Sequence, residues 1–193
     1  MDTPYGNYKE NKFILPAAVL DFFVTLFVCL AIGILIYWQI ARPHKVSGLS
    51  MYPTFHNGDY IITDEIIYKL TSPQRGQVIV FEDPKDHSED FIKRIIGLPG
   101  DTIELLNGRV FVNGKQLNES YLNPSIQTNS ESFLQEGESI TVPQNHYFVL
   151  GDNRPNSSDS RDFGFVDKSE IIGQAFFRYW PSNSIGLIPT AHY

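Results

Sequence analysis

Cysteine is nearly absent from the sequence. Its 193 residues contain only Cys29, so no intramolecular disulfide can form and zinc sites built from CxxC pairs are excluded. Basic residues are also scarce, because 15 Lys and Arg stand against 22 Asp and Glu and give a net charge of −7. That balance argues against a protein whose main work is to coat nucleic acid. The 14 glycines and 12 prolines follow no period, which excludes a fibrous repeat.

Charged residues are missing altogether from Phe22 to Ile40, which reads FFVTLFVCLAIGILIYWQI. As a helix this run extends about 28 Å, close to the ~30 Å hydrocarbon core of a bilayer. A core helix of a soluble protein is rarely apolar on every face for five turns. A cleaved signal peptide has a shorter apolar region and a small-residue cleavage site, which this run lacks. We therefore predict an uncleaved transmembrane anchor at 22–40, after an N-terminal tail at 1–21.

The charges beside this run do not choose its orientation. Lys9 and Lys12 precede it and Arg42 and Lys45 follow it, so the positive-inside rule gives a tie. The acidic residues gather later in the chain, since residues 1–45 hold only three of the 22. We expect an acidic domain at 41–193, which electrostatics alone would not hold flat against anionic lipid.

The composition of residues 41–193 is typical of a mainly β fold. Short runs rich in Ile, Val and aromatic residues predict strands at Tyr60–Thr63, Gln77–Phe81, Phe91–Ile96, Val110–Val112 and His146–Leu150. The hairpin signals Asn107-Gly108 and Asn113-Gly114 predict a meander of Ile103–Leu106, Arg109–Val112 and Lys115–Leu117. No helix of three turns is expected after residue 45. Polar residues predict a long loop at Asn123–Glu138, within an insertion near 118–139.

Two loops carry most of the chemical information. The first follows the apolar run and reads VSGLSMYPT from Val46 to Thr54, where a serine between glycine and proline is commonly just a turn residue. The second reads GDNRPNSSDSR from Gly151 to Arg161. Its oxygen-bearing side chains suit a plain surface loop, and they lack the spacing and the final glutamate of an EF-hand. We expect no metal site there.

Lys93 occupies an unusual position. Alternate residues of a strand share a face, so Lys93 lies between Phe91 and Ile95 on an apolar stripe. One interpretation is an edge-strand lysine whose amine reaches water. The other is a desolvated lysine, neutral near pH 7, that serves as a general base. Arg94 is expected on the opposite face as an ordinary cation.

A serine nucleophile needs a base to accept its proton. The five histidines show neither a Gly-x-Ser-x-Gly setting nor a triad pattern. The sequence therefore offers serine with lysine more naturally than serine with histidine.

Four segments in this order resemble the bacterial and organellar type I signal peptidases. They read SGLSMYPT from Ser47, RGQVIVF from Arg75, KRIIGLPGD from Lys93, and GDNR from Gly151 with Ser160-Arg161 after it. With the apolar run, the resemblance covers residues 13 to 181. It implies a largely antiparallel β catalytic domain after a single transmembrane helix. It also implies a membrane-anchored serine endopeptidase that removes signal peptides from exported preproteins through an acyl-enzyme.

The resemblance also implies residue roles. Ser50 matches the nucleophile and Lys93 the general base. Ser157 matches a serine that orients the lysine amine, and Asp159 and Arg161 match a pair that holds the Gly-Asp-Asn-Arg loop near the site. Neither a cofactor nor nucleic acid is implied. The expected partners are preproteins and the lipid bilayer, and the catalytic domain is expected as a monomer on the extracytoplasmic side of the plasma membrane.

One departure concerns the oxyanion hole. Some relatives carry a serine two residues before the nucleophile, whose hydroxyl completes the hole, and that position is Gly48 here. Either a backbone group or water supplies the second donor beside the backbone N–H of Ser50, or the loop brings Ser47 into place.

Substrate contacts are the remaining expectation at the site. An extended peptide is expected to add to a strand edge near Lys93. The candidate walls of its pocket, for which ordinary core packing is the alternative, are Val46, Met51, Phe91 and Ile92.

Three other functions fit less well. A self-cleaving repressor of the SOS type would need a DNA-binding helical region where this chain has the apolar run. A structural β protein would not explain a lysine on an apolar strand face. The main alternative is a catalytically inactive, membrane-anchored paralogue that binds preproteins, which would most simply have lost Ser50 or Lys93.

Overall fold

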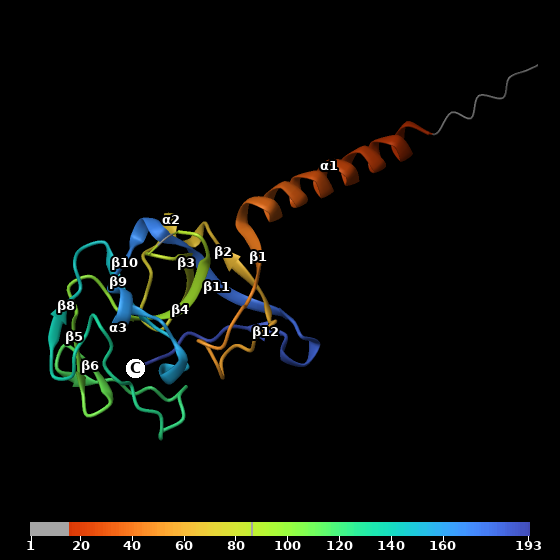
Figure 1. Cartoon of the computed structure of the whole chain (residues 1–193). Coiled ribbons are helices and arrows are strands. Elements are labelled where there is room, and N and C mark those ends of the chain that lie inside the picture. Colours follow the sequence, from red (N-terminus) through yellow and green to blue (C-terminus); the bar gives the residue numbers. More distant parts are fainter. Residues whose placement is uncertain (1–15, 86) are drawn as a thin grey trace, which may run out of the picture. The chain divides into compact units, whose positions relative to one another are not determined.

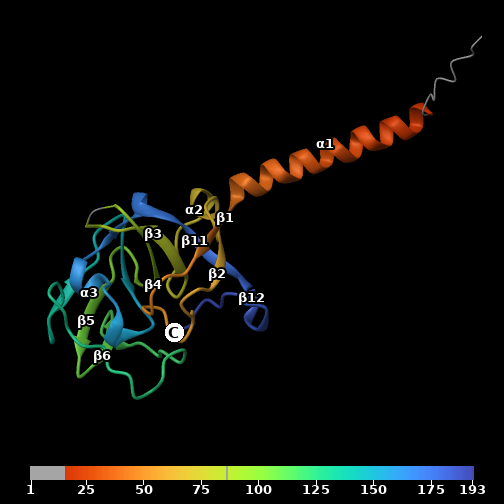
Figure 2. The same cartoon turned by 45° about the vertical axis from the view of Figure 1, so that its right-hand side comes forward.

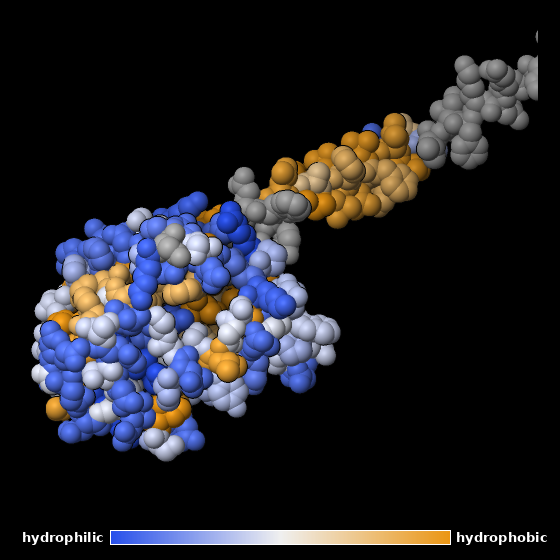
Figure 3. Space-filling view, viewed as in Figure 1, coloured by the Kyte–Doolittle hydropathy of each residue, from blue (hydrophilic) through white to orange (hydrophobic). Residues whose placement is uncertain are grey.

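The chain has two units in a computed structural model that describes residues 16–85 and 87–193. The first unit ends at Trp38 and the second is Gln39–Tyr193. Nearly all of α1 (Ala17–Ile40) belongs to the first unit, and only its last two residues belong to the second. Its stretch Ala17–Leu35 is long and apolar enough to cross a membrane. Figure 3 shows apolar side chains along the visible face of this helix.

The helix begins earlier than the predicted anchor. Its first turn starts at Ala17, and the N–H groups of Val19 and Leu20 donate to the Pro16 carbonyl. Asp21 therefore lies inside the helix, where a carboxylate near the N-terminus is tolerated by the helix dipole. Of the predicted tail at 1–21, residues 1–15 lie outside the described residues.

The second unit contains two antiparallel sheets, which confirms the predicted fold class (Figure 1). The larger has the order β1-β2-β11-β3-β4-β9-β10, with β12 paired to β11. Its strands are β1 (Ala41–Lys45), β2 (Tyr60–Asp64), β3 (Val78–Glu82), β4 (Asp90–Gly97), β9 (His146–Leu150), β10 (Val166–Asp167), β11 (Ile171–Trp180) and β12 (Gly186–Leu187).

The smaller sheet is the predicted meander with one added strand. Its order is β7-β6-β5-β8. The strands are β5 (Thr102–Leu106), β6 (Arg109–Val112), β7 (Lys115–Gln116) and β8 (Ser139–Thr141). Both hairpin turns have positive φ at their Asn and Gly, with 51° and 71° at Asn107 and Gly108, as two-residue turns of this type require. In two views, β5 and β6 lie at the end of the unit opposite β2 and β12 (Figures 1 and 2).

The helices of the second unit are short, as expected. They are α2 (Ile67–Leu70), α3 (Ser160–Phe163) and the 3-10 turns η1 (Arg154–Asn156), η2 (Lys168–Glu170) and η3 (Ser182–Ser184). Between β7 and β8, the described chain runs from 117 to 138 without a helix or a named strand. This segment is held in place by the Arg161 carbonyl, which accepts from the N–H groups of Phe133 and Leu134.

The largest core cluster lies where the smaller sheet meets β4 and β9. Its buried members are Ile96, Ile103, Leu105, Val110, Val112, Leu134, Val142, Phe148 and Leu150. Phe148 is fully buried, whereas Leu106 is 38% exposed at the end of β5. Packing in this cluster fixes the second half of β4, which contains Ile96. Lys93 lies in the first half of the same strand.

Truncation of a side chain in this cluster should strongly destabilise the second unit. We expect Phe148→Ala to lower the free energy of unfolding by about 3–5 kcal/mol, because it removes buried apolar surface and leaves a cavity. The matched change at the half-exposed Leu106, Leu106→Ala, should cost about 1 kcal/mol or less. Urea unfolding of the full chain in mild detergent, followed by fluorescence, measures both. Equal losses at the two positions would contradict this account of the core.

Candidate active site

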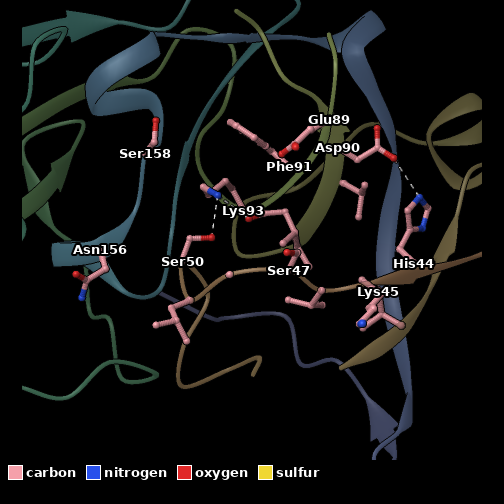
Figure 4. Close-up of a pocket in the computed structure, with 16 residues that line it drawn as sticks. His44, Lys45, Ser47, Ser50, Glu89, Asp90, Phe91, Lys93, Asn156 and Ser158 are labelled. Atoms are coloured by element: carbon pink, nitrogen blue, oxygen red, sulfur yellow. Dashed lines mark hydrogen bonds and ion pairs between the residues drawn. The ribbon is translucent and has the colours of Figure 1, made fainter. Parts of the chain in front are cut away.

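A pocket of about 410 Å³ opens between β1 with its following loop and β4 (Figure 4). Three strands separate β1 from β4 in the sheet order, so the sheet must curl to bring both to one pocket. His44 Nε2 lies 3.6 Å from Asp90 Oδ2 and links the two strands away from Ser50. The lining residues are His44–Ser50, Ile61, Val80, Glu89–Lys93, Asn156 and Ser158.

Ser50 and Lys93 meet inside this pocket. The Lys93 Nζ lies 3.0 Å from Ser50 Oγ and donates a second hydrogen bond of 3.1 Å to the Ile92 carbonyl. The amine also lies 5.1 Å from the centre of the Phe91 ring. Ser50 comes from the loop after β1 and Lys93 from β4, 43 residues later, so only the fold brings the pair together.

The Lys93 amine is desolvated. Its residue is 4% exposed, which rules out the edge-strand lysine that reaches water. Burial lowers the pKa of Lys93 from 10.5 to about 8, although the carboxylates of Asp159 and Asp152 act in the opposite direction. At pH 7 roughly one Lys93 amine in ten is then neutral. This neutral fraction is smaller than that of the lysine predicted from the sequence, which is neutral near pH 7. Neutral and charged forms become equal near pH 8.

Arg94 is not the ordinary cation that the alternation of β4 suggested. It is 1% exposed and forms two hydrogen bonds with Asp152, of 2.9 Å from Nε to Oδ1 and 2.7 Å from Nη2 to Oδ2. Its guanidinium carbon lies 4.4 Å from the centre of the Tyr121 ring. Both faces of β4 are buried from Ile92 onward, so a cation on either face needs a partner.

Asp152 and Asn153 hold the serine loop. Thr54 Oγ1 donates to Asp152 Oδ2 at 2.5 Å. The backbone N–H of Asn153 donates to the Ser50 carbonyl at 2.9 Å, and its side-chain amide donates to the Leu49 carbonyl at 3.0 Å. The Gly-Asp-Asn-Arg loop thus fixes the backbone that carries Ser50.

Asp159 and Arg161 form a buried ion pair, with Arg161 Nε 2.8 Å from Asp159 Oδ1. Asp159 Oδ2 accepts from the backbone N–H of Gly151 at 3.0 Å. Arg161 Nη2 donates to the Arg154 carbonyl at 2.8 Å. These bonds close the loop from Gly151 to Arg161 upon itself.

Ser157 lies close to Ser50 but does not bond the lysine. Its Oγ is buried and has no hydrogen-bond partner among the described residues. A methyl group at Gly151 would come within 2.1 Å of Ser157 Oγ and 2.5 Å of the Ser50 carbonyl oxygen. Only glycine at 151 lets the two serine segments approach this closely.

The two oxyanion candidates differ in what they offer. Gly48 has φ of +88°, and its N–H donates to Asn57 Oδ1 at 3.1 Å. Ser47 lines the pocket. Among the four wall candidates, Val46, Phe91 and Ile92 line the pocket, whereas Met51 packs in the core cluster that also holds Phe55.

Sequence reasoning missed several residues here. His44 and Asp90 were not singled out, and neither were Thr54 or Asn153. A signal existed for Asp152 and Asn153, because they begin the motif loop, but their contacts with the serine loop depend on tertiary structure.

Comparisons with known proteins show the family of this chain. A family model described as signal peptidase, peptidase S26 matches residues 19–180. The chain is 40% identical over 166 residues to a probable signal peptidase I-2 of Synechocystis sp., covering 83% of this chain and 72% of that protein. It is 33% identical over 174 residues to a signal peptidase IB of Staphylococcus aureus, covering 84% and 90%. The chain belongs to the signal peptidase I family.

Membership makes the chain a peptidase, a hydrolase of peptide bonds, and supports the removal of signal peptides from preproteins. The resemblance drawn from the four motifs is thereby confirmed. A crystal structure of a signal peptidase I from Enterococcus faecalis is 38% identical, with a TM-score of 0.46 over 54% of this chain and 97% of that one.

The buried Arg94–Asp152 pair should be far more sensitive to substitution than an exposed ion pair. Arg94→Gln leaves the Asp152 carboxylate buried without its cation, so we expect a loss of about 3–5 kcal/mol in the free energy of unfolding. Arg42 forms an exposed pair with Glu65, its side chain being 65% accessible, and Arg42→Gln should cost about 1 kcal/mol or less. Urea unfolding in detergent compares the two. A loss of similar size in both variants would refute the special role of the buried pair.

Proposed function

We propose that this chain is a membrane-anchored serine endopeptidase that removes signal peptides with Ser50 as nucleophile and Lys93 as general base. The observation that carries the proposal is the 3.0 Å contact between Ser50 Oγ and the buried amine of Lys93. Proximity alone would mean little for an exposed lysine, which stays charged near pH 7. Burial supplies the missing condition, because it lowers the pKa into the range where a neutral amine is common.

The reaction follows from this contact. The neutral Lys93 amine accepts the Ser50 proton while Oγ attacks the scissile carbonyl, forming a tetrahedral intermediate. The Lys93 ammonium then protonates the leaving amine, and the peptide bond breaks to give an acyl-enzyme. Water, deprotonated by Lys93, hydrolyses the ester and restores the hydroxyl of Ser50.

The oxyanion needs donors that are already oriented. The backbone N–H of Ser50 is one. We assign the second to the hydroxyl of Ser47, since the N–H of Gly48 is engaged by Asn57 and Ser47 lines the same pocket. The role of Gly48 is then conformational, because its positive φ lets the loop turn before Ser50.

An extended signal peptide fits between β1 and β4. β1 pairs with β2, and β4 pairs with β9 only from Arg94 onward, so the Asp90–Lys93 edge faces the pocket without a β9 partner. A peptide strand can add to such edges through main-chain hydrogen bonds. The apolar walls at Val46, Phe91 and Ile92 suit small apolar side chains before the cleaved bond. Met51 packs in the same core cluster as Val46 and so supports this wall without lining the pocket.

We further propose that α1 anchors the chain in the plasma membrane and that the 41–193 domain works as a monomer on its extracytoplasmic side, where preproteins emerge. The length and composition of α1 support the anchor. The inactive, preprotein-binding paralogue is the alternative, but Ser50 and Lys93 are both present and in contact, so nothing in the site favours it.

Loss of either member of the pair should abolish cleavage. We expect Ser50→Ala and Lys93→Ala to lower the kcat/KM for a purified preprotein by about 10³-fold or more, because each removes an essential step. Lys115→Ala on the exposed β7 is the matched control and should match the wild type. Retained cleavage in both Ser50→Ala and Lys93→Ala would disprove the Ser–Lys assignment, whereas an intact wild type that never cleaves would favour the binding paralogue.

The pH dependence tests the base itself. Because the neutral amine is the active form and the pKa of Lys93 is lowered to about 8, wild-type kcat/KM should rise with pH and reach half its plateau near pH 8. An ordinary exposed lysine would place that midpoint about two units higher. Initial rates from pH 6 to 10 give the profile. A rate that is flat across this range would contradict lysine as the base.

Ser157 is proposed to orient the Lys93 amine once substrate is bound, because its buried hydroxyl has no hydrogen-bond partner in the described part of the chain. We expect Ser157→Ala to lower kcat about tenfold or more with little change in KM, because a misaligned base slows proton transfer. Ser125→Ala, at an exposed position of the 117–138 segment, is the control. An unchanged kcat in Ser157→Ala would remove Ser157 from the mechanism.

A further inference from the structure

The segment of residues 188–193 follows β12 and passes beside Arg94, the residue after Lys93 on β4. It leads from β12 toward the middle of the domain in both views (Figures 1 and 2). The Ile188 N–H donates to the Phe176 carbonyl at 2.9 Å, which ties the segment to β11. The Ala191 N–H donates to the Gly76 carbonyl at 3.1 Å, which ties it to the chain before β3.

Gly76 is shaped for this contact. Its φ is +89°, and a methyl group there would lie 2.0 Å from the Ala191 carbonyl oxygen. No side chain fits at that distance, so the two backbones meet only because residue 76 is glycine. Gly100 has nearly the same φ, +87°, with nothing within 4 Å of an added methyl group.

The segment closes over Arg94. Arg94 Nη1 donates to the Gly76 carbonyl at 2.8 Å and to the Pro189 carbonyl at 3.4 Å. Tyr193 donates from its hydroxyl to that of Tyr121 at 3.2 Å, and Tyr121 lies over the guanidinium. The segment therefore supplies part of the enclosure that keeps Arg94 and Asp152 away from water, where a paired charge interacts more strongly.

This enclosure lies one residue from the proposed base. Arg94 follows Lys93 on β4, and Asp152 accepts from Thr54, while the next residue, Asn153, bonds the Ser50 carbonyl. Displacing the segment would loosen Arg94 and Asp152, and with them both the strand of Lys93 and the loop of Ser50.

We propose that residues 188–193 form a positioning strap that holds the Arg94–Asp152 pair and thereby keeps Ser50 Oγ in reach of Lys93 Nζ. The proposal rests on the Ser50–Lys93 function above. The strap touches neither substrate nor the reacting atoms, so its residues act through Arg94 and Asp152. Its loss should therefore lower kcat more than it raises KM.

The test compares two glycines in the full chain in detergent. Gly76→Ala drives a methyl group into the Ala191 carbonyl, whereas Gly100→Ala imposes similar backbone strain with open space around it. We expect Gly76→Ala to lower the kcat for a purified preprotein about tenfold or more with KM within about twofold, because small displacements of reacting groups slow catalysis sharply. Gly100→Ala should stay within about twofold of the wild type. Rates are expressed per folded molecule, with the folded fraction read from thermal unfolding monitored by fluorescence.

A second pair covers the case in which Gly76→Ala fails to fold. Tyr193→Ala removes the contact with Tyr121, and Leu70→Ala truncates an exposed side chain that lies outside residues 188–193. We expect a lowered kcat only in Tyr193→Ala. Wild-type kcat per folded molecule in Tyr193→Ala, or equal losses in each matched pair, would overturn the strap. Inactive Ser50→Ala and Lys93→Ala beside fully active strap variants would leave the proposed function standing, whereas active Ser50→Ala and Lys93→Ala would refute the function itself.

Discussion

The buried ion pair between Arg94 and Asp152 is the interaction on which the arrangement of the site depends. Both side chains are almost fully removed from water. Their desolvation is offset by the close, two-point geometry of the pair, by the Tyr121 ring, and by hydrogen bonds to the Gly76 carbonyl and from Thr54. Arg94 belongs to the strand of Lys93, and Asp152 belongs to the loop that bonds the Ser50 segment. One contact therefore joins the two halves of the proposed catalytic pair.

A second constraint concerns charge. The carboxylates of Asp152 and Asp159 both raise the pKa of Lys93, whereas burial lowers it to about 8. Each carboxylate is bound to its own arginine, Asp152 to Arg94 and Asp159 to Arg161. Arginine stays charged at all relevant pH values, so it neutralises these acids permanently. The arginines thus allow acidic residues to build the loop without holding the lysine in its charged form.

Turn residues and short apolar runs predicted those strands and hairpins whose formation depends on neighbouring residues in the chain. The two Asn-Gly turns predicted the meander, and the apolar run at 146–150 predicted β9 with the bounds that the structure shows. β1 was missed because ARPHK has no apolar alternation and a proline in its middle. The full ten-residue length of β11 was not predicted, because its register shifts between Ala175 and Phe177 and between Arg178 and Trp180, which breaks the period of two. The helix begins at Ala17, before the predicted anchor, because a single charge such as Asp21 does not stop a helix.

The sequence by itself determined the family, the apolar helix, the mainly antiparallel β class and the chemical types available at the site, because motif order and local pattern are properties of the chain. Only the tertiary structure decided that Lys93 is buried, that Arg94 is enclosed rather than exposed, and that Met51 supports the pocket from the core. It also placed residues 188–193 behind Arg94. Burial, distance and pKa depend on segments that lie far apart in the chain, and those meet only when the sheet curls.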